Sequence, residues 1–304
     1  MATVPLVVLL VGAEVAAHVL GLDQGNAAWD RFDDTTPCHQ ASLELGWEAI
    51  PSECGRDEHG FIVAHEPRTG TAEATLVVLG DSIADQDLWV DVVRRGLPEL
   101  DVLNAGVRGY GPCQELALAR RAIEAVEPDW MLLQTCANDL HEAPVLTVDD
   151  TGNRTFRWAG DTFTVPGWLF YSELAGWLAL RYAEANLARN APEDAGAVEA
   201  ANLRCLTQLR DLAAAADIGL SVVAFPVLAA PAEAGTLYDS EETLRLHVES
   251  LNIPQLALRA EFGLEASSWT AMRSTPQDLL HPNERAMRRA GRALLPFLGE
   301  NLTR

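Results

Sequence analysis

Short runs of consecutive apolar, mostly β-branched residues alternate along the chain with longer stretches of helical periodicity. The apolar runs predict strands at 75–80, 101–106, 130–135 and 220–226. Apolar residues at helical spacing predict helices near 86–97, 112–126, 168–189, 195–217, 240–261 and 283–300. Alternation of this kind is typical of a parallel sheet with helices on both faces. The predicted fold class is therefore α/β, with three layers.

Three of the predicted strands run directly into polar or glycine-rich turns. The three segments are TLVVLGDS (Thr75–Ser82), DVLNAGVRGYG (Asp101–Gly111) and WMLLQTCANDL (Trp130–Leu140). Functional sites of parallel sheets lie at the carboxyl ends of the strands. We therefore expect Ser82, Gly109 and Asn138 to converge on one edge of the sheet.

A fourth segment, DLLHPNE (Asp278–Glu284), places a carboxylate three residues before a histidine. On a turn or at the start of a helix, that spacing brings both side chains to the same side. A serine hydroxyl needs a base within hydrogen-bond reach before it acts as a nucleophile. Asp278 can hold the imidazole of His281 in the tautomer that accepts the proton of Ser82.

Each segment taken alone also has a plainer interpretation. A serine after a strand usually caps a helix or closes a turn. Asn-Asp after a strand is usually a turn, and His-Pro-Asn usually caps or stops a helix. The sequence contains no GxSxG motif, which disfavours a site of the α/β-hydrolase type. The occurrence of all four segments in one chain favours a functional site.

The order GDS, NAGVRGYG, ANDL and DLLHPN resembles the four blocks of the SGNH (GDSL-type) hydrolases and spans about residues 75–303. The resemblance implies the flavodoxin-like, three-layer SGNH hydrolase fold, in a bacterial envelope-type member. It implies that Ser82 is the nucleophile and that Asp278 and His281 are the acid and the base. The implied oxyanion hole consists of the backbone N–H groups of Ser82 and Gly109 and the side-chain amide of Asn138.

Two neighbours of these residues are expected to support the site. We expect Asp81 to pair with the backbone of neighbouring loops and Asp139 to orient Asn138. The chain departs from the family pattern at Ile83, where many members have leucine. It also has Cys136-Ala137 before Asn138, where the family commonly has a leading glycine.

The resemblance implies a serine esterase that cleaves an O-acyl ester through an acyl-serine intermediate, with water as the final acceptor. The expected substrate is a small-molecule or glycan ester, for example an acetyl group on a carbohydrate, or a lipid ester. Two alternatives stay open: transfer of the acyl group to a sugar hydroxyl by an envelope polysaccharide O-acyltransferase, and a catalytically silent SGNH-like binding domain. No cofactor and no metal is expected.

Composition narrows these classes further. A chain of 304 residues with 48% hydrophobic and 22% charged residues is long enough for one sizeable α/β domain with additions. Its formal net charge is -22, and all 22 basic residues are arginine. A surface of this sign repels phosphate backbones, so nucleic acid is not an expected partner.

Residues 2–22 form an almost unbroken apolar run, interrupted only by Glu14 and His18. About 20 helical residues just cross a bilayer, so residues 1–24 are expected to form a signal or a single membrane anchor of an envelope or secreted protein. No arginine precedes the run, which instead favours a helix packed on a cytoplasmic protein. Residues 25–74 are expected to be a linker and lead-in, and 75–304 the hydrolase domain.

Two further features carry expectations about structure. Val145–Val165 is predicted to form a small hairpin within an insertion between the third and fourth core strands. The five cysteines show no zinc-site spacing. In an exported protein, Cys38 would pair with Cys54, and Cys113 with Cys136. Otherwise all five are reduced thiols packed as small hydrophobic side chains.

Overall fold

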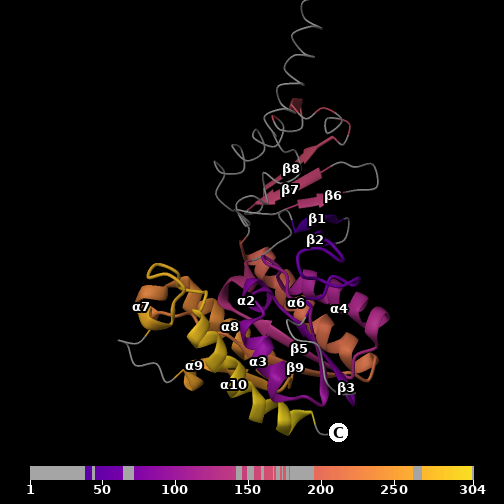
Figure 1. Ribbon diagram of the computed structural model, residues 1–304. Coiled ribbons are helices and arrows are strands. Elements are labelled where there is room, and N and C mark those ends of the chain that lie inside the picture. Colours follow the sequence, from indigo (N-terminus) through magenta and orange to yellow (C-terminus); the bar gives the residue numbers. More distant parts are fainter. Residues whose placement is uncertain are drawn as a thin grey trace, which may run out of the picture. The chain divides into compact units, whose positions relative to one another are not determined.

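The computed structural model describes residues 38–42, 45–63, 72–141, 146–148, 154–158, 161–166, 168, 172, 174–175, 178, 195–262 and 269–302. The chain divides into two compact units, and Figure 1 shows the ribbon with its elements labelled. One unit is formed by residues 1–50 and 143–195, and the other by residues 51–142 and 196–304. All four blocks of the candidate site therefore belong to the second unit.

A five-stranded parallel sheet is the centre of the second unit. Its strands are β3 (Ala74–Leu79), β4 (Leu100–Asn104), β5 (Trp130–Thr135), β9 (Gly219–Ala224) and β10 (Gln255–Ala257). They lie in the order β10-β9-β5-β3-β4, and every neighbouring pair is parallel. Numbered along the chain, this is the flavodoxin-like order 2-1-3-4-5, with the switch point between β3 and β5. The predicted fold class is confirmed.

Helices cover both faces of this sheet (Figure 1). They are α2 (Ser82–Asp85), α3 (Leu88–Gly96), α4 (Pro112–Val126), α6 (Ala195–Ala215), α7 (Pro231–Ala234), α8 (Thr236–Ser250), α9 (Leu258–Glu261) and α10 (Glu284–Asn301). Two short 3-10 turns, η1 (Ala137–Leu140) and η3 (Thr270–Met272), follow β5 and precede the last block.

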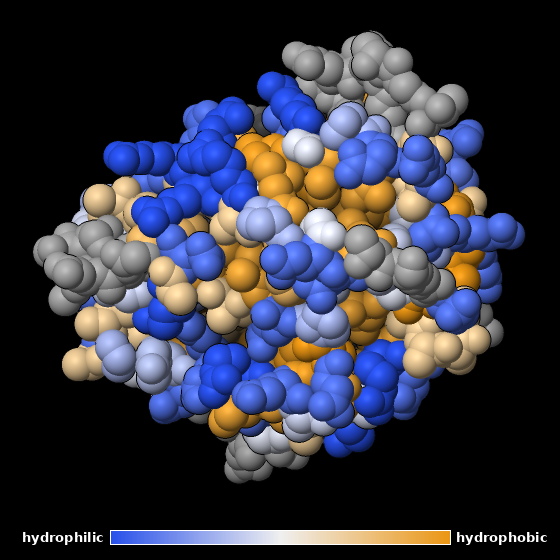
Figure 2. All heavy atoms as spheres, turned by 90° about the horizontal axis from the view of Figure 1, so that it is seen from below, coloured by the Kyte–Doolittle hydropathy of each residue, from blue (hydrophilic) through white to orange (hydrophobic). Residues whose placement is uncertain are grey.

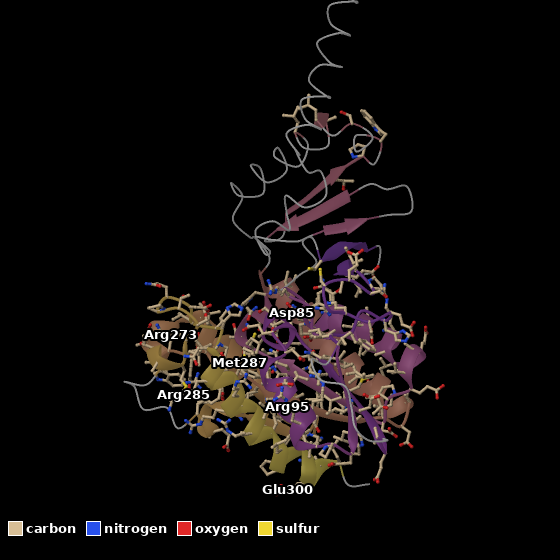
Figure 3. The ribbon with its side chains drawn as sticks, viewed as in Figure 1. Asp85, Arg95, Arg273, Arg285, Met287 and Glu300 are labelled. Atoms are coloured by element: carbon tan, nitrogen blue, oxygen red, sulfur yellow. A yellow bond between two sulfur atoms is a disulfide. The ribbon has the colours of Figure 1, made fainter. Side chains whose placement is uncertain are left out.

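One face of the sheet packs against α3 and α10. Leu76 and Val78 of β3 point to this face, where they join Trp89 and Met287 in a buried core. Figure 3 labels Met287 together with Arg285, which is exposed on the same helix. The side chain of the intervening Val77 points to the opposite face of the sheet, because side chains alternate along a strand. It is also fully buried, so both faces of β3 are covered. A strand buried on both sides explains the continuous apolar run of the first block.

The surface mixes polar and apolar side chains. On the face shown in Figure 2, hydrophilic residues lie around and between apolar ones. This mixture is normal for a folded protein, because polar groups are too few to cover the whole surface.

One of the two expected disulfide pairs is wrong. Cys113 of α4 forms a disulfide with Cys205 of α6, and not with Cys136. Cys136 is a free, buried thiol at the end of β5. The prediction assumed that the loops after two strands would be joined, whereas Cys113 lies on a helix whose neighbour is another helix. Cys38 and Cys54 are both disulfide-bonded.

Two predicted helices differ from the observed ones beside a residue with positive φ. The predicted helix at 86–97 is present as α3, which begins at Leu88, directly after Asp87 with a φ of 57°. The predicted helix at 240–261 ends at Ser250 and gives way to β10 and α9, after Asn252 with a φ of 56°. Left-handed backbone stops a helix, and aspartate and asparagine adopt it more readily than most residues.

The described residues of the first unit form two antiparallel sheets. β1 (His39–Ser42) pairs with β2 (Gly46–Ala49), inside the segment expected to be a linker. β7 (Arg154–Trp158) pairs with both β6 (Leu146–Val148) and β8 (Asp161–Val165). The predicted hairpin at Val145–Val165 is thus present, with a third strand added.

Two predicted helices fall on residues that the structure does not describe. The predicted N-terminal apolar helix lies outside the described residues, and so does most of the predicted helix at 168–189. Within the described part of the chain, no helix has the length and apolar character needed to span a bilayer.

Replacing Cys205 with serine is expected to lower the free energy of unfolding by roughly 2–5 kcal/mol. The bond links residues separated by 92 positions, so its loss frees a long loop in the unfolded chain. Urea denaturation followed by circular dichroism measures the change. A Cys113→Ser, Cys205→Ser double variant should match the single variant, and a Cys205→Ser protein as stable as the original would contradict the assignment.

Candidate active site

Ser82 is the first residue of α2 and lies three residues after the end of β3, which pairs with β4 and β5. The carboxylate of Asp81 caps this turn by accepting the backbone N–H of Ile83 at 2.9 Å. The side-chain oxygen of Gln134 on β5 accepts the backbone N–H groups of Asp81 and Ala84. The backbone on both sides of Ser82 is therefore fixed to the neighbouring strand.

The hydroxyl of Ser82 meets the imidazole of His281 across 199 residues of sequence. Ser82 Oγ lies 2.8 Å from His281 Nε2, and His281 Nδ1 lies 2.9 Å from Asp278 Oδ2. Both distances lie within the range for proton transfer along a hydrogen bond. The structure thus brings together the three residues that the sequence suggests for nucleophile, base and acid.

The carboxylate of Asp278 is held by donors from its own loop. It accepts the backbone N–H groups of Leu280 and His281 and the hydroxyl of Ser274. Partial burial by itself raises the pKa of Asp278, but the backbone N–H groups, the Ser274 hydroxyl and the charge of His281 together bring it below its ordinary value. Asp278 is therefore ionised at neutral pH and can orient His281.

Arg273 and Asn283 shape this loop, and sequence reasoning missed the first of them. The buried guanidinium of Arg273 donates to the carbonyls of Leu228 and Pro276. Asn283 caps α10 by accepting the N–H of Ala286, and its amide donates back to the carbonyl of Arg273. The asparagine before a helix is a readable capping signal, whereas nothing in the sequence marks Arg273.

The second block forms a loop directly beside the nucleophile turn. Val107 donates its N–H to the carbonyl of Gly80, so the loop runs along the segment before Ser82. A Cβ on Gly106 would lie 2.6 Å from that of Ala84, which leaves no room for a side chain. Gly109 has a φ of 71°, a conformation that favours glycine. Space at Gly106 and backbone conformation at Gly109 therefore both favour glycine.

Asn138 lies on η1, immediately after β5, and is half-buried. The amide of Asn202 on α6 donates to the carbonyls of Asp139 and Leu140, which anchors this turn to a helix. Because β4 and β5 flank β3 in the sheet, Gly109 and Asn138 follow the two strands on either side of the one that leads to Ser82.

Beneath the nucleophile lies a buried group of acidic and thiol side chains. One ligand atom each from Asp81, Cys136 and Asp139 lies within 4.8 Å of the others, a spacing that could hold a metal ion. Glu115 of α4 is fully buried nearby, and neither of its carboxylate oxygens has a hydrogen-bond partner among the described residues. Burial, and then the charges of Asp139 and Asp81, raise the pKa of Glu115 well above its ordinary value.

The two supporting aspartates bind groups next to the nucleophile and next to Asn138. Asp81 accepts the backbone N–H of Ile83 within its own segment and faces the thiol of Cys136. Asp139 accepts the backbone N–H of Cys136 at 2.8 Å, which closes the turn that carries Asn138. Both carboxylates therefore fix backbone geometry, and sequence reasoning missed Glu115 beside them.

Two arginines, Arg56 and Arg108, bind Asp85 at the end of α2, the turn that begins with Ser82. Asp85, labelled in Figure 3, forms ion pairs with both Arg56 and Arg108. Arg56 also donates to the carbonyl of Gly106, which lies in the second block. Residues 51–63, expected to be linker, thus help to hold the loop of the second block.

Comparisons with known proteins were made by sequence and by structure. No family model matches the chain, and no curated protein sequence matches it. Esterase EstA from Pseudoalteromonas sp. is 15% identical and covers 76% of this chain and 99% of its own, with a TM-score of 0.46. A catalytic mutant of Axe2, an acetylxylan esterase from Geobacillus stearothermophilus, is 16% identical and covers 77% and 97%, with a TM-score of 0.49.

A lipase/acylhydrolase from Enterococcus faecalis is 16% identical and covers 75% of this chain and 96% of its own, with a TM-score of 0.45. Identities and scores of this size carry no argument about activity. We therefore take the chemistry of this chain from the geometry of its own site.

Replacing Asp278 with asparagine is expected to lower stability at neutral pH, and the difference from the original protein should shrink in acid. A carboxyl whose folded-state pKa is depressed contributes stability above its unfolded pKa and loses it as pH falls through the folded value. Urea midpoints between about pH 7 and pH 3 test this, because the unperturbed pKa is about 3.9. A difference that grows on acidification would contradict the depressed pKa.

Proposed function

We propose that the chain is a serine ester hydrolase of the SGNH type, which cleaves an O-acyl ester through an acyl-Ser82 intermediate. The observation that carries the proposal is the continuous relay from Ser82 Oγ to His281 Nε2, and from His281 Nδ1 to Asp278, at 2.8 and 2.9 Å. A relay of this geometry raises the nucleophilicity of a serine at neutral pH.

In the first half of the reaction, Ser82 Oγ attacks the carbonyl carbon of the ester and gives its proton to His281 Nε2. Negative charge collects on the former carbonyl oxygen, which the backbone N–H groups of Ser82 and Gly109 and the amide Nδ2 of Asn138 stabilise. The tetrahedral intermediate then collapses. The bond to the alcohol oxygen breaks, and His281 returns the proton to the departing alcohol.

In the second half, a water molecule gives a proton to His281 while its oxygen attacks the acyl carbon. Collapse of the second intermediate breaks the bond to Ser82 Oγ, which recovers its proton, and the free acid leaves. The imidazole of His281 is 35% exposed, so water has access to the base. This access favours water as acceptor over a mechanism that must exclude it.

A sugar hydroxyl in place of this water would make the same triad an acyltransferase, so the acceptor is read from the products. Release of stoichiometric acid in the presence of a glycan acceptor supports the hydrolase. Acyl groups retained on the glycan would instead support the transferase.

Replacing Ser82 with alanine is expected to lower kcat for p-nitrophenyl acetate by roughly 10³-fold or more. Without the hydroxyl, no acyl-enzyme forms, and the base has no nucleophile to activate. A fluorophosphonate probe should label the original protein at Ser82, as located by mass spectrometry, and leave the variant unlabelled. Equal hydrolysis rates for the two proteins would contradict the proposed function.

Replacing Asn138 with alanine is expected to lower kcat by about 10²–10³-fold, because one oxyanion donor is lost. His141→Gln is the matched control, because His141 ends the same turn but is exposed and bonds to Ser240. Steady-state kinetics on the same ester compare the two variants. A loss of similar size in His141→Gln would point to general disturbance of the turn.

A further inference from the structure

The side chain of Cys136 touches the amide of Asn138 directly. Its Sγ lies 2.7 Å from Asn138 Oδ1, 3.1 Å from Asp81 Oδ2 and 3.5 Å from Asp139 Oδ1. The residue is buried and is a free thiol. A thiol carries one hydrogen, so it can donate to only one of these oxygens at a time.

Cys136 acts here as a donor and not as a thiolate. Burial, and then the charges of Asp139 and Asp81, raise the pKa of the Cys136 thiol well above its ordinary value. Each of the three atoms around Sγ is an oxygen acceptor in this arrangement. A protonated sulfur is the form that such surroundings stabilise.

The shortest of the three contacts decides which way the Asn138 amide turns. The two ends of an asparagine amide differ in chemistry, since one accepts hydrogen bonds and the other donates them. With Oδ1 against the thiol, Nδ2 points to the opposite side. Turned around, the amide would present oxygen lone pairs to the developing oxyanion and repel it.

We propose that Cys136 is a positioning residue, whose S–H holds Asn138 Oδ1 inward so that Nδ2 faces the oxyanion. The proposal rests on the proposed function, because it assigns a role within that site. The backbone N–H groups of Ile83 and Cys136 bind the other oxygen of each neighbouring carboxylate, Asp81 Oδ1 and Asp139 Oδ2. Of the three oxygens that face Sγ, Asn138 Oδ1 is the nearest. A glycine at this position would keep the backbone bond but offer no donor to the amide.

The test compares Cys136→Ala with Cys136→Ser in p-nitrophenyl acetate hydrolysis. Loss of the donor in Cys136→Ala should lower kcat about tenfold with KM unchanged, on the scale of one hydrogen bond. Cys136→Ser restores a donor, and its kcat should stay within about threefold of the original. Thr135→Ser, a change at the buried neighbouring position, is the packing control and should leave the kinetics unaltered.

A double-mutant cycle separates positioning from general stability. In an Asn138→Ala background, Cys136→Ala should cause no further loss of kcat, because there is no amide left to orient. Equal losses in the alanine and serine variants, or a Cys136→Ala effect that persists without Asn138, would overturn the proposal. One equivalent of metal in the purified protein that Cys136→Ser abolishes would also overturn it, since the sulfur would then be a ligand.

A second measurement remains informative if the original protein hydrolyses no ester, the outcome that contradicts the proposed function. The side-chain amide of Asn138 gives a pair of NMR signals, identified by their loss in Asn138→Ala. Cys136→Ala should shift these signals, whereas Cys136→Ser should keep them near their original positions. Unchanged signals in Cys136→Ala would overturn the proposed contact.

Discussion

The parallel pairing of β3 with β4 on one side and β5 on the other is the constraint on which the site depends. It brings three chain segments, separated by tens of residues, to the same edge of one sheet. Because β3 is buried on both faces, a slip in its register would exchange the side chains of the two faces and disturb the packing on both. The turn that carries Ser82 is fixed to both neighbours of β3. The side chain of Gln134 on β5 accepts the N–H of Asp81, and the carbonyl of Gly80 accepts the N–H of Val107 in the second-block loop.

The candidate site combines two kinds of carboxylate, and their surroundings separate them. Asp278 is partly exposed and accepts hydrogen bonds from two backbone N–H groups, the Ser274 hydroxyl and His281 Nδ1, so it stays charged beside His281. Glu115 has burial and negative neighbours instead, and these favour its neutral form. The number of donors around each carboxylate, more than its distance from Ser82, thus decides whether it carries charge in the site.

The core elements of the second unit could be predicted from the sequence because hydrophobic burial alone determines them. The buried strands and α4 follow from apolar periodicity, and the order of the four blocks placed Ser82, Asp278 and His281 correctly relative to one another. The end of α8 before Asn252 was missed because a single left-handed residue leaves the apolar periodicity intact. The Cys113–Cys205 bond and the role of Arg56 were missed because they depend on which helices and loops become neighbours in space.

The Cys113–Cys205 disulfide joins two helices that stand on either side of the inserted segment in the sequence. Cys113 precedes residues 143–195, and Cys205 follows them. The loop that this bond closes therefore contains the entire insertion. After a single protease cut between residues 143 and 195, the two fragments would stay joined by this disulfide. They would migrate as one band on a denaturing gel until a reductant is added.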